Sequence, residues 1–273
     1  FDKRRDVSRL SGVVEAVGYG SDIDDLNGTI TVDSLLYYGG ADTIKAGHIA
    51  MMTRNDDDSK YLRLNSDFAD LELQGRRSYR NIFEYFKNTV RKYLPALQNS
   101  DIRSVTETLT TGEHSYDVPA APPEEVPDTL APTDAEAMND YYIARLNVKS
   151  ATGVADIFVP GLNVAEGTSM SFLFNPTLNR FSLSLKSDYI MKGENIVSNL
   201  NIDSRSDADS ISLFIRAGDV VAGNLYFPDV SVFGGIRNNS VGLYGRFENR
   251  GDGSAAFIAS RSRFAVDPNT GLT

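Results

Sequence analysis

The sequence predicts a mainly β protein, an antiparallel meander accompanied by one amphipathic helix. Apolar and polar residues alternate with a period of two over long stretches in both halves of the chain. Clusters of Gly, Asn, Asp and Pro separate these stretches, as turns separate strands. Strand-like and helix-like stretches do not alternate, so a parallel sheet of the nucleotide-binding type is not expected.

The first part of the chain predicts strands that lead into a helix. We expect strands over Thr29–Tyr37, Thr43–Met51, Tyr61–Asn65 and Ala69–Gln74. In the last of these, apolar residues occupy every second position between Asp70, Glu72 and Gln74. This alternation predicts a strand with one buried and one solvated face.

The helix is expected over residues 79–94, with Ser78 as its N-cap and Pro95 at its end. Its apolar residues share one face: Ile82, Phe86, Val90 and Tyr93. The window 76–92 holds six basic residues and one acid, a net charge of +5. Such a helix could lie on an anionic membrane surface, or it could cover one end of the sheet with its charged face in water. We favour the second interpretation.

The last part of the chain predicts hairpins. Strands over Thr168–Asn175 and Phe181–Lys186 are joined by turn residues and form the first hairpin. The alternation continues at Ile196/Ser198/Leu200/Ile202, Ile211/Leu213/Ile215, Val241/Leu243/Phe247 and Phe257/Ala259. Turns are expected between them at Asp207–Asp209, Gly218–Asp219, Asn238–Asn239 and Gly251–Gly253. Strands of about 6–8 residues result.

An acidic, proline-rich segment, 99–139, separates the two parts. It contains five of the ten prolines, nine acids and one base, and so carries −8 of the formal net charge of −10. We expect a solvated linker or excursion between a β segment, 1–98, and a β-meander, 140–273. Because the other residues together carry −2, and neutralising phosphates requires an excess of positive charge on the folded part, nucleic acid is not an expected partner.

Motifs for catalysis and metal binding are scarce in the sequence. The chain has no Cys and two His, His48 in a strand-like stretch and His114 in the acidic segment. It has no nucleophile-elbow, phosphate-loop or dinucleotide-binding motif. We expect no catalytic residues, no cofactor and no metal centre, and therefore not an enzyme.

Two acidic clusters come closest to a metal site. The cluster Asp22–Gly28 approaches the spacing of a calcium loop, but Leu26 stands at the third ligand position and Asp33 stands where a Glu usually closes the loop. The cluster Asn55–Asp58 is explained by a hairpin turn. We expect solvated turns at both places.

The expected strands offer more apolar surface than one helix can cover. Either two sheets pack face to face as a sandwich, or one sheet curves into a trough whose inside takes another apolar group. In a trough, the candidate lining residues are Met170, Phe172, Phe174, Phe181, Leu183, Leu185, Leu200, Ile202, Ile211, Leu213 and Ile215.

Two stretches carry a resemblance to a known family. They are YLRLNSDFADLELQG at 61–75, which leads into the helix and its LPAL end at 94–97, and FVPGLNVAEGTSMSFLFN at 158–175. Together they resemble the TamB/AsmA-like proteins of Gram-negative bacteria, which include the translocation and assembly module. The resemblance covers residues 28–98 and 140–260.

This resemblance implies a β-taco, a curved antiparallel sheet forming an open half-pipe with a hydrophobic groove. It also implies a periplasmic protein, anchored in the inner membrane through a segment outside this sequence, that shields or conducts phospholipid or other acyl chains between the two membranes. In outer membrane biogenesis, an outer-membrane β-barrel and client proteins are the implied partners. An exposed acyl chain costs about 25 cal/mol per Å² in water, and a groove removes this cost without any catalytic group.

Two alternative functions remain open. The open sheet edges could take a strand from an outer-membrane client, so that the protein is an assembly scaffold. A glycan-binding β-sandwich at the cell surface is the less favoured alternative. The chain opens with Phe1 and shows neither a signal peptide nor a run of apolar residues that could span a membrane, so we expect a piece of a longer protein.

Overall fold

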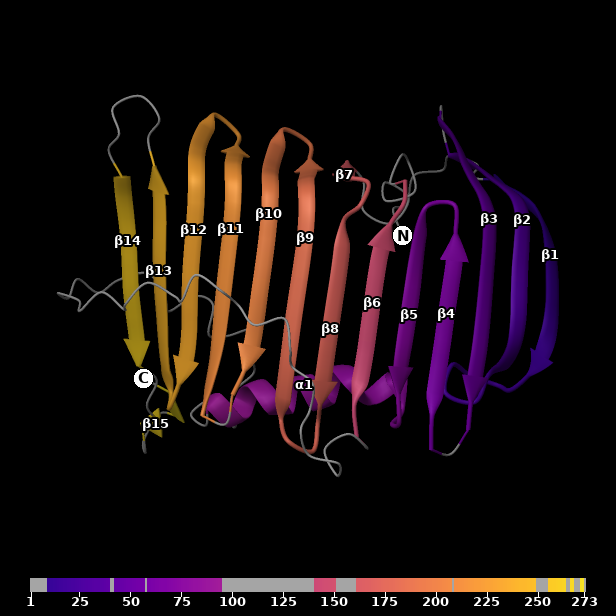
Figure 1. The fold of residues 1–273 in the computed structure, drawn as a ribbon, viewed down its shortest axis with the longest axis horizontal. Coiled ribbons are helices and arrows are strands. Elements are labelled where there is room, and N and C mark those ends of the chain that lie inside the picture. The colour runs from indigo at the N-terminus through magenta and orange to yellow at the C-terminus, as the bar shows by residue number, and fades with distance from the viewer. Residues whose placement is uncertain are drawn as a thin grey trace.

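The structure, a computed structural model, describes residues 9–39, 42–56, 58–94, 140–150, 161–207, 209–248, 255–263, 266–267 and 271–272. One large open antiparallel sheet dominates these residues (Figure 1). Its strands are β1 (Arg9–Tyr19), β2 (Asn27–Gly39), β3 (Asp42–Asn55), β4 (Lys60–Ser66), β5 (Ala69–Gly75), β6 (Tyr142–Val148), β7 (Leu162–Val164), β8 (Ser169–Asn175), β9 (Arg180–Lys192), β10 (Asn195–Ser206), β11 (Ser210–Ala222), β12 (Leu225–Arg237), β13 (Ser240–Glu248) and β14 (Ala255–Arg263).

The order of strands in the sheet follows the order in the chain. Each strand from β1 to β14 pairs with the next, except that the short β7 pairs with β9 beside the main path. Among the described residues, the only other sheet is the small pair β15 (Val266–Asp267) and β16 (Gly271–Leu272). The expected mainly β meander, open and with a single short helix, is therefore confirmed, and the described strands form one layer rather than a sandwich.

The sheet is continuous across the acidic segment. Strand β5 pairs with β6 from Ala69 opposite Val148 to Gly75 opposite Tyr142. At the last pair the Tyr142 ring lies so close that a Cβ on Gly75 would be 2.7 Å from Tyr142 Cδ1, which explains the glycine. Segment 99–139 itself lies outside the described residues.

Strands in the C-terminal part are longer than predicted. β9, β11 and β12 each have 13 residues. The turns expected at Asp207–Asp209 and Asn238–Asn239 join strands as predicted, whereas Gly218–Asp219 lies inside β11. That turn prediction was wrong because the true turn follows Ala222, where Gly223 adopts a φ of 57°. The turn expected at 251–253 lies outside the described residues.

The expected helix divides into a 3₁₀ turn, η1 (Tyr79–Asn81), and α1 (Ile82–Tyr93). It runs across the lower ends of the strands (Figure 1). A core cluster of buried residues lies between the helix and the sheet and consists of Tyr93 from the helix together with Tyr142, Phe174, Phe181 and Ile211 from the strands.

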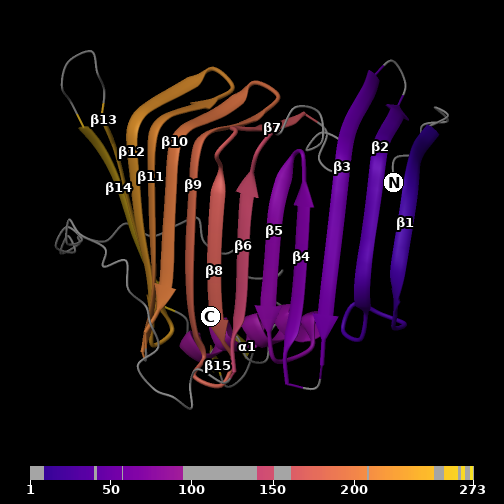
Figure 2. The same cartoon turned by 45° about the vertical axis from the view of Figure 1, so that its right-hand side comes forward.

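A crease crosses the upper part of β9 to β12. Asn199 on β10 and Asp229 on β12 have left-handed φ values of 49° and 48°, and Gly218 lies between them on β11. The strands bend there, out of the plane of the rest of the sheet (Figure 2). The predicted alternation through Ile196 and Ile202 is therefore wrong at Asn199, because a left-handed residue rotates the chain beyond it.

Candidate functional site

A row of apolar side chains crosses the strands on one face of the sheet. Residues directly opposite each other in antiparallel strands point to the same face, so the row can be followed from pair to pair. This central row consists of Ala16, Ile30, Met51, Leu64, Leu71, Leu146, Met170, Leu185, Ile202, Ile215 and Val232. Since neighbouring strands lie about 4.8 Å apart, it extends for roughly 48 Å.

The central row is not closed off from solvent. From Ile30 to Val232, every one of its side chains is half-buried rather than buried. An apolar sheet face normally packs against a second layer, and on this one η1 and α1 pack over the core cluster alone. The row is therefore an apolar surface that the described residues leave partly uncovered.

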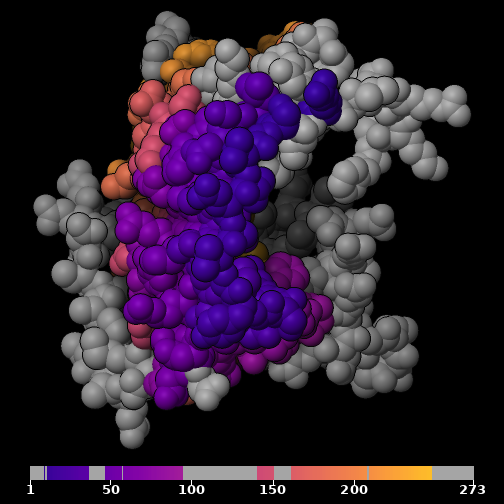
Figure 3. All heavy atoms as spheres, turned by 90° about the vertical axis from the view of Figure 1, so that its right-hand side faces the viewer, coloured from indigo at the N-terminus to yellow at the C-terminus, as the bar shows by residue number. Residues whose placement is uncertain are grey.

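The apolar face has a rim on each side of the central row. Helix α1 forms the lower rim, and the strand ends above the crease form the upper rim (Figures 1 and 2). Viewed from the β1 edge, the coloured atoms curve around a hollow, with α1 in magenta at its lower side (Figure 3). We call this face, between α1 and the crease, the groove.

The structure places the predicted lining residues on the groove face, but not all in the open part. Phe174, Phe181 and Ile211 belong to the buried core under α1, and Phe172 packs against that core. The others are half-buried along the open groove: Met170, Leu183, Leu185, Leu200, Ile202, Leu213 and Ile215. Phe174, Phe181 and Ile211 are therefore unavailable to a ligand because the helix covers them.

The apolar face of the helix is turned into the protein. Ile82, Phe86 and Val90 pack against the core that contains Tyr93. The Phe86 ring lies 5.1 Å from that of Phe181 and meets it edge-on, a favourable aromatic geometry. Docked in this way, the helix cannot offer this face to a membrane.

The C-terminal end of α1 is tied to the hairpin turns below the sheet. The Tyr93 hydroxyl lies 2.6 Å from the carbonyl oxygen of Asp207 and 3.0 Å from that of Asn179. The backbone N–H of Asn239 donates to the Tyr93 carbonyl at 3.2 Å. The spacing of apolar residues along the helix predicted that Tyr93 lies on its apolar face. Spacing alone could not identify the backbone groups in the turns that form hydrogen bonds with Tyr93.

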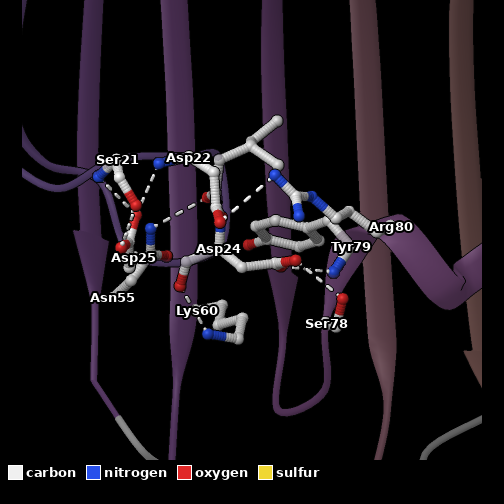
Figure 4. Close-up of polar contacts among 10 residues, drawn as sticks. Ser21, Asp22, Asp24, Asp25, Asn55, Lys60, Ser78, Tyr79 and Arg80 are labelled. Atoms are coloured by element: carbon white, nitrogen blue, oxygen red, sulfur yellow. Dashed lines mark hydrogen bonds and ion pairs between the residues drawn. The ribbon is translucent and has the colours of Figure 1, made fainter.

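The N-terminal end of the helix is held by Asp24, from the loop between β1 and β2 (Figure 4). Its carboxylate accepts hydrogen bonds from the Tyr79 backbone N–H at 2.6 Å and from the Ser78 hydroxyl at 2.7 Å. Ser78 stands at the N-cap position of η1, but its side chain accepts no capping hydrogen bond; its hydroxyl donates to Asp24, and that carboxylate is the side chain that accepts the Tyr79 N–H.

The electrostatics around Asp24 favour its charged form. Burial by itself would raise the pKa of Asp24, but the hydrogen bonds from Ser78 and Tyr79, together with nearby Lys60, outweigh this and lower it. Lys60 Nζ also donates to the Asp24 carbonyl oxygen at 2.6 Å. The sequence did not predict the contact between Asp24 and Ser78, because more than fifty residues separate the two.

The acidic cluster at 22–28 is a structured turn whose carboxylates diverge. Asp22 forms an ion pair with Arg80 at 3.2 Å, and Asp25 accepts hydrogen bonds from the backbone of Ser21 and Asp22 (Figure 4). In the second cluster, Asp56 accepts from the Ser59 backbone, while residue 57 lies outside the described part. Within the described ranges, no three His, Cys, Asp or Glu side chains converge as metal ligands.

The opposite face of the sheet is charged where it crosses β4, β5 and β6, whereas Phe214, Phe233 and Tyr244 are paired on that face in β11 to β13. Arg63, Glu72 and Arg145 are directly paired across β4, β5 and β6, and Arg145 lies 3.4 Å from Glu72. A shallow depression of about 520 Å³ lies among these side chains and neighbouring serines. His48 and Asp33 form a 2.6 Å contact at an exposed position, and His114 lies outside the described residues. The two faces therefore differ in chemistry over β4 to β6, where charged pairs lie behind the leucines of the central row.

Comparison with known proteins gives no assignment. No protein-family model matches the chain, and neither a curated protein nor a solved structure matches it. In the part of the chain that the structure describes, neither helix has the length and apolar composition needed to cross a bilayer. The groove, with its two rims, is the strongest candidate site.

Proposed function

We propose that the groove binds lipid acyl chains and that the protein is a non-catalytic segment of a periplasmic lipid bridge. The observation that supports this proposal is the central row, unbroken from β1 to β12 and half-buried over most of its length. Exposed apolar patches above a few hundred Å² usually mark an interaction site. Hydrocarbon suits this patch because the row offers no hydrogen-bond donor, and its only acceptors are the weak thioether sulfurs of Met51 and Met170.

The dimensions favour several chains in succession rather than one small ligand. The hydrocarbon layer of one bilayer leaflet is about 15 Å thick, roughly a third of the length of the central row. Because the row crosses the strands while the rims run beside it, we propose that acyl chains move across the strands. The resemblance to TamB/AsmA-like proteins supports the periplasmic setting, the inner-membrane anchor and a β-barrel partner as parts of the same proposal.

The experiment is native mass spectrometry of the protein purified from a Gram-negative host, with co-purified phospholipid as the readout. Leu185→Glu places a charge in the central row, whereas Ser184→Glu places it one residue away on the polar face. We expect the first variant to lose bound lipid and the second to keep it, with both folded by circular dichroism. A folded Leu185→Glu protein carrying the usual lipid load contradicts the proposal.

The edge strand β1 favours a second candidate function, the binding of a client strand by β-augmentation. β1 ends the sheet, so one row of its backbone groups has no strand beside it in the described part. Its side chains are unusually exposed for apolar residues, with Val17 76% and Tyr19 75% accessible. A photo-crosslinker at Val17 that captures an added, unfolded outer-membrane protein supports this function, and capture equal to that at Thr29 on β2 contradicts it.

A further inference from the structure

The crease turns apolar residues of the strand ends toward the groove. On β12, Asp229 is the left-handed residue, and the side chains of Phe227 and Val230 on either side of it line the same pocket. In a regular strand, residues three apart point to opposite faces. The Phe227 ring lies 5.1 Å from that of Phe247 on β13, edge-on at 80°. The strand end above Asp229 is therefore folded over toward the groove face.

The residues above the crease continue the apolar surface. Direct pairing places Phe227 beside Val220, Val220 beside Val197, and Val197 beside Ile190. All four side chains are half-buried. They form a second apolar row, above and parallel to the central row.

Between this upper row and the central row lies a pocket of about 200 Å³. Its lining consists of Val220, Phe227, Val230, Val232, Gly245, Arg246 and Phe247. Val232 is also the last residue of the central row, so the pocket opens onto the groove where that row ends. Apart from Arg246, no lining side chain can donate or accept a hydrogen bond.

We propose that this pocket holds the methyl end of an acyl chain whose remainder lies along the central row. The inference rests on the proposed function and adds a fixed end site to it. Pockets for whole small molecules usually measure about 300–1,000 Å³, so this one suits part of a chain. A peptide is disfavoured because β11, β12 and β13 are paired on both sides and leave its backbone no partners.

The test uses two photoreactive palmitic acids, one with its diazirine near the methyl end and one with it near the carboxylate. Bound to the wild-type protein, the methyl-end probe is expected to label peptides that contain Val220, Phe227 or Phe247, and the carboxylate probe to label elsewhere. Equal labelling of the pocket by both probes, or no pocket labelling by the methyl-end probe, overturns the inference.

A matched pair of variants provides a second readout. Val230→Phe fills the pocket, while Ser231→Phe adds the same ring one residue away, at a position that does not line the pocket. We expect Val230→Phe to weaken palmitate binding roughly fourfold for each methylene forced out, and Ser231→Phe to leave it unchanged. If Val230→Phe fails to fold, Phe227→Ala replaces it. In this variant the methyl-end probe is expected to label peptides outside the pocket as well as those that line it.

The outcomes separate the two proposals. Suppose that the wild-type protein binds palmitate and that Leu185→Glu abolishes binding. If the two probes then label the pocket equally and Val230→Phe binds palmitate as well as Ser231→Phe, only the end site is wrong. If the wild-type protein binds no palmitate and carries no phospholipid, both proposals fall.

Discussion

The hydroxyl of Tyr93 on α1 lies 2.6 Å from the carbonyl oxygen of Asp207, in the turn between β10 and β11. These residues come from opposite sides of the acidic segment, and Tyr93 is 3% exposed. The contact joins the helix that forms the lower rim of the groove to the sheet that forms its floor. The position of the rim therefore depends on a hydrogen bond between distant parts of the chain.

Tyr93→Phe is expected to lower the free energy of unfolding by about 1–3 kcal/mol, because it leaves the carbonyl oxygens of Asp207 and Asn179 without this buried donor. Urea denaturation followed by circular dichroism measures the change. Tyr189→Phe, at a 39% exposed residue, is the control and is expected to change stability by less than about 0.5 kcal/mol. Equal effects of the two substitutions would show that the Tyr93 hydroxyl contributes nothing.

Phe86→Ala is expected to cost about 3–5 kcal/mol, because it removes the ring that packs against Phe172, Phe174 and Phe181. Phe83, three residues earlier on the same helix, is 71% exposed, so Phe83→Ala is expected to cost less than about 0.5 kcal/mol. Thermal unfolding of both variants tests the orientation of the helix. A larger effect at Phe83 would mean that α1 is rotated relative to the sheet.

Asp24→Asn keeps an acceptor for the Tyr79 N–H and removes the charge, so it tests the pH dependence of the loop contact. Because the folded protein lowers the pKa of Asp24, the carboxylate stabilises the fold above the unfolded-state pKa of about 3.9. That stabilisation is lost as the pH falls through the lower, folded-state pKa. Wild type is expected to be more stable than Asp24→Asn at pH 7, and the gap is expected to close in more acidic solution. Unfolding curves that differ equally at pH 7 and pH 2.5 would contradict this.

Asn199→Val is expected to destabilise the protein by about 1–2 kcal/mol, because a β-branched residue tolerates a φ of 49° poorly. Asn199→Gly is the matched variant and is expected to stay close to wild type, since glycine adopts this conformation without a steric penalty. Urea midpoints of the two variants measure the difference. Equal stability of the two would indicate that the crease does not need a left-handed residue at Asn199.

Local patterns in the sequence predicted the local structure well. Alternation at Ala69–Gln74 and Thr168–Asn175 predicted strands that match β5 and β8 to within one residue at each end. The spacing of Ile82, Phe86 and Val90 predicted a helical face that packs against the core. Such patterns succeed because a period of two or of 3.6 residues is set by backbone geometry over a few neighbouring residues.

The crease and the helix anchor show where local reasoning fails. Gly218–Asp219 has the composition of a turn, but its neighbours on β10 and β12 continue the ladder on both sides and keep it within a strand. Ser78 is a typical N-cap residue, but the carboxylate that accepts the Tyr79 N–H belongs to Asp24, from a loop distant in the sequence. In both cases a partner far along the chain decides between two conformations that the local sequence allows.

By itself, the sequence determined that this protein is an antiparallel meander with one amphipathic helix and more apolar strand surface than that helix can cover. Tertiary structure decided that the described strands form one layer, that α1 closes only one side of their apolar face, and that a crease folds the other side over. The reason is that the alternation of apolar and polar residues determines which side chains share a face of a strand. The pairing between strands distant in the sequence determines what packs against that face.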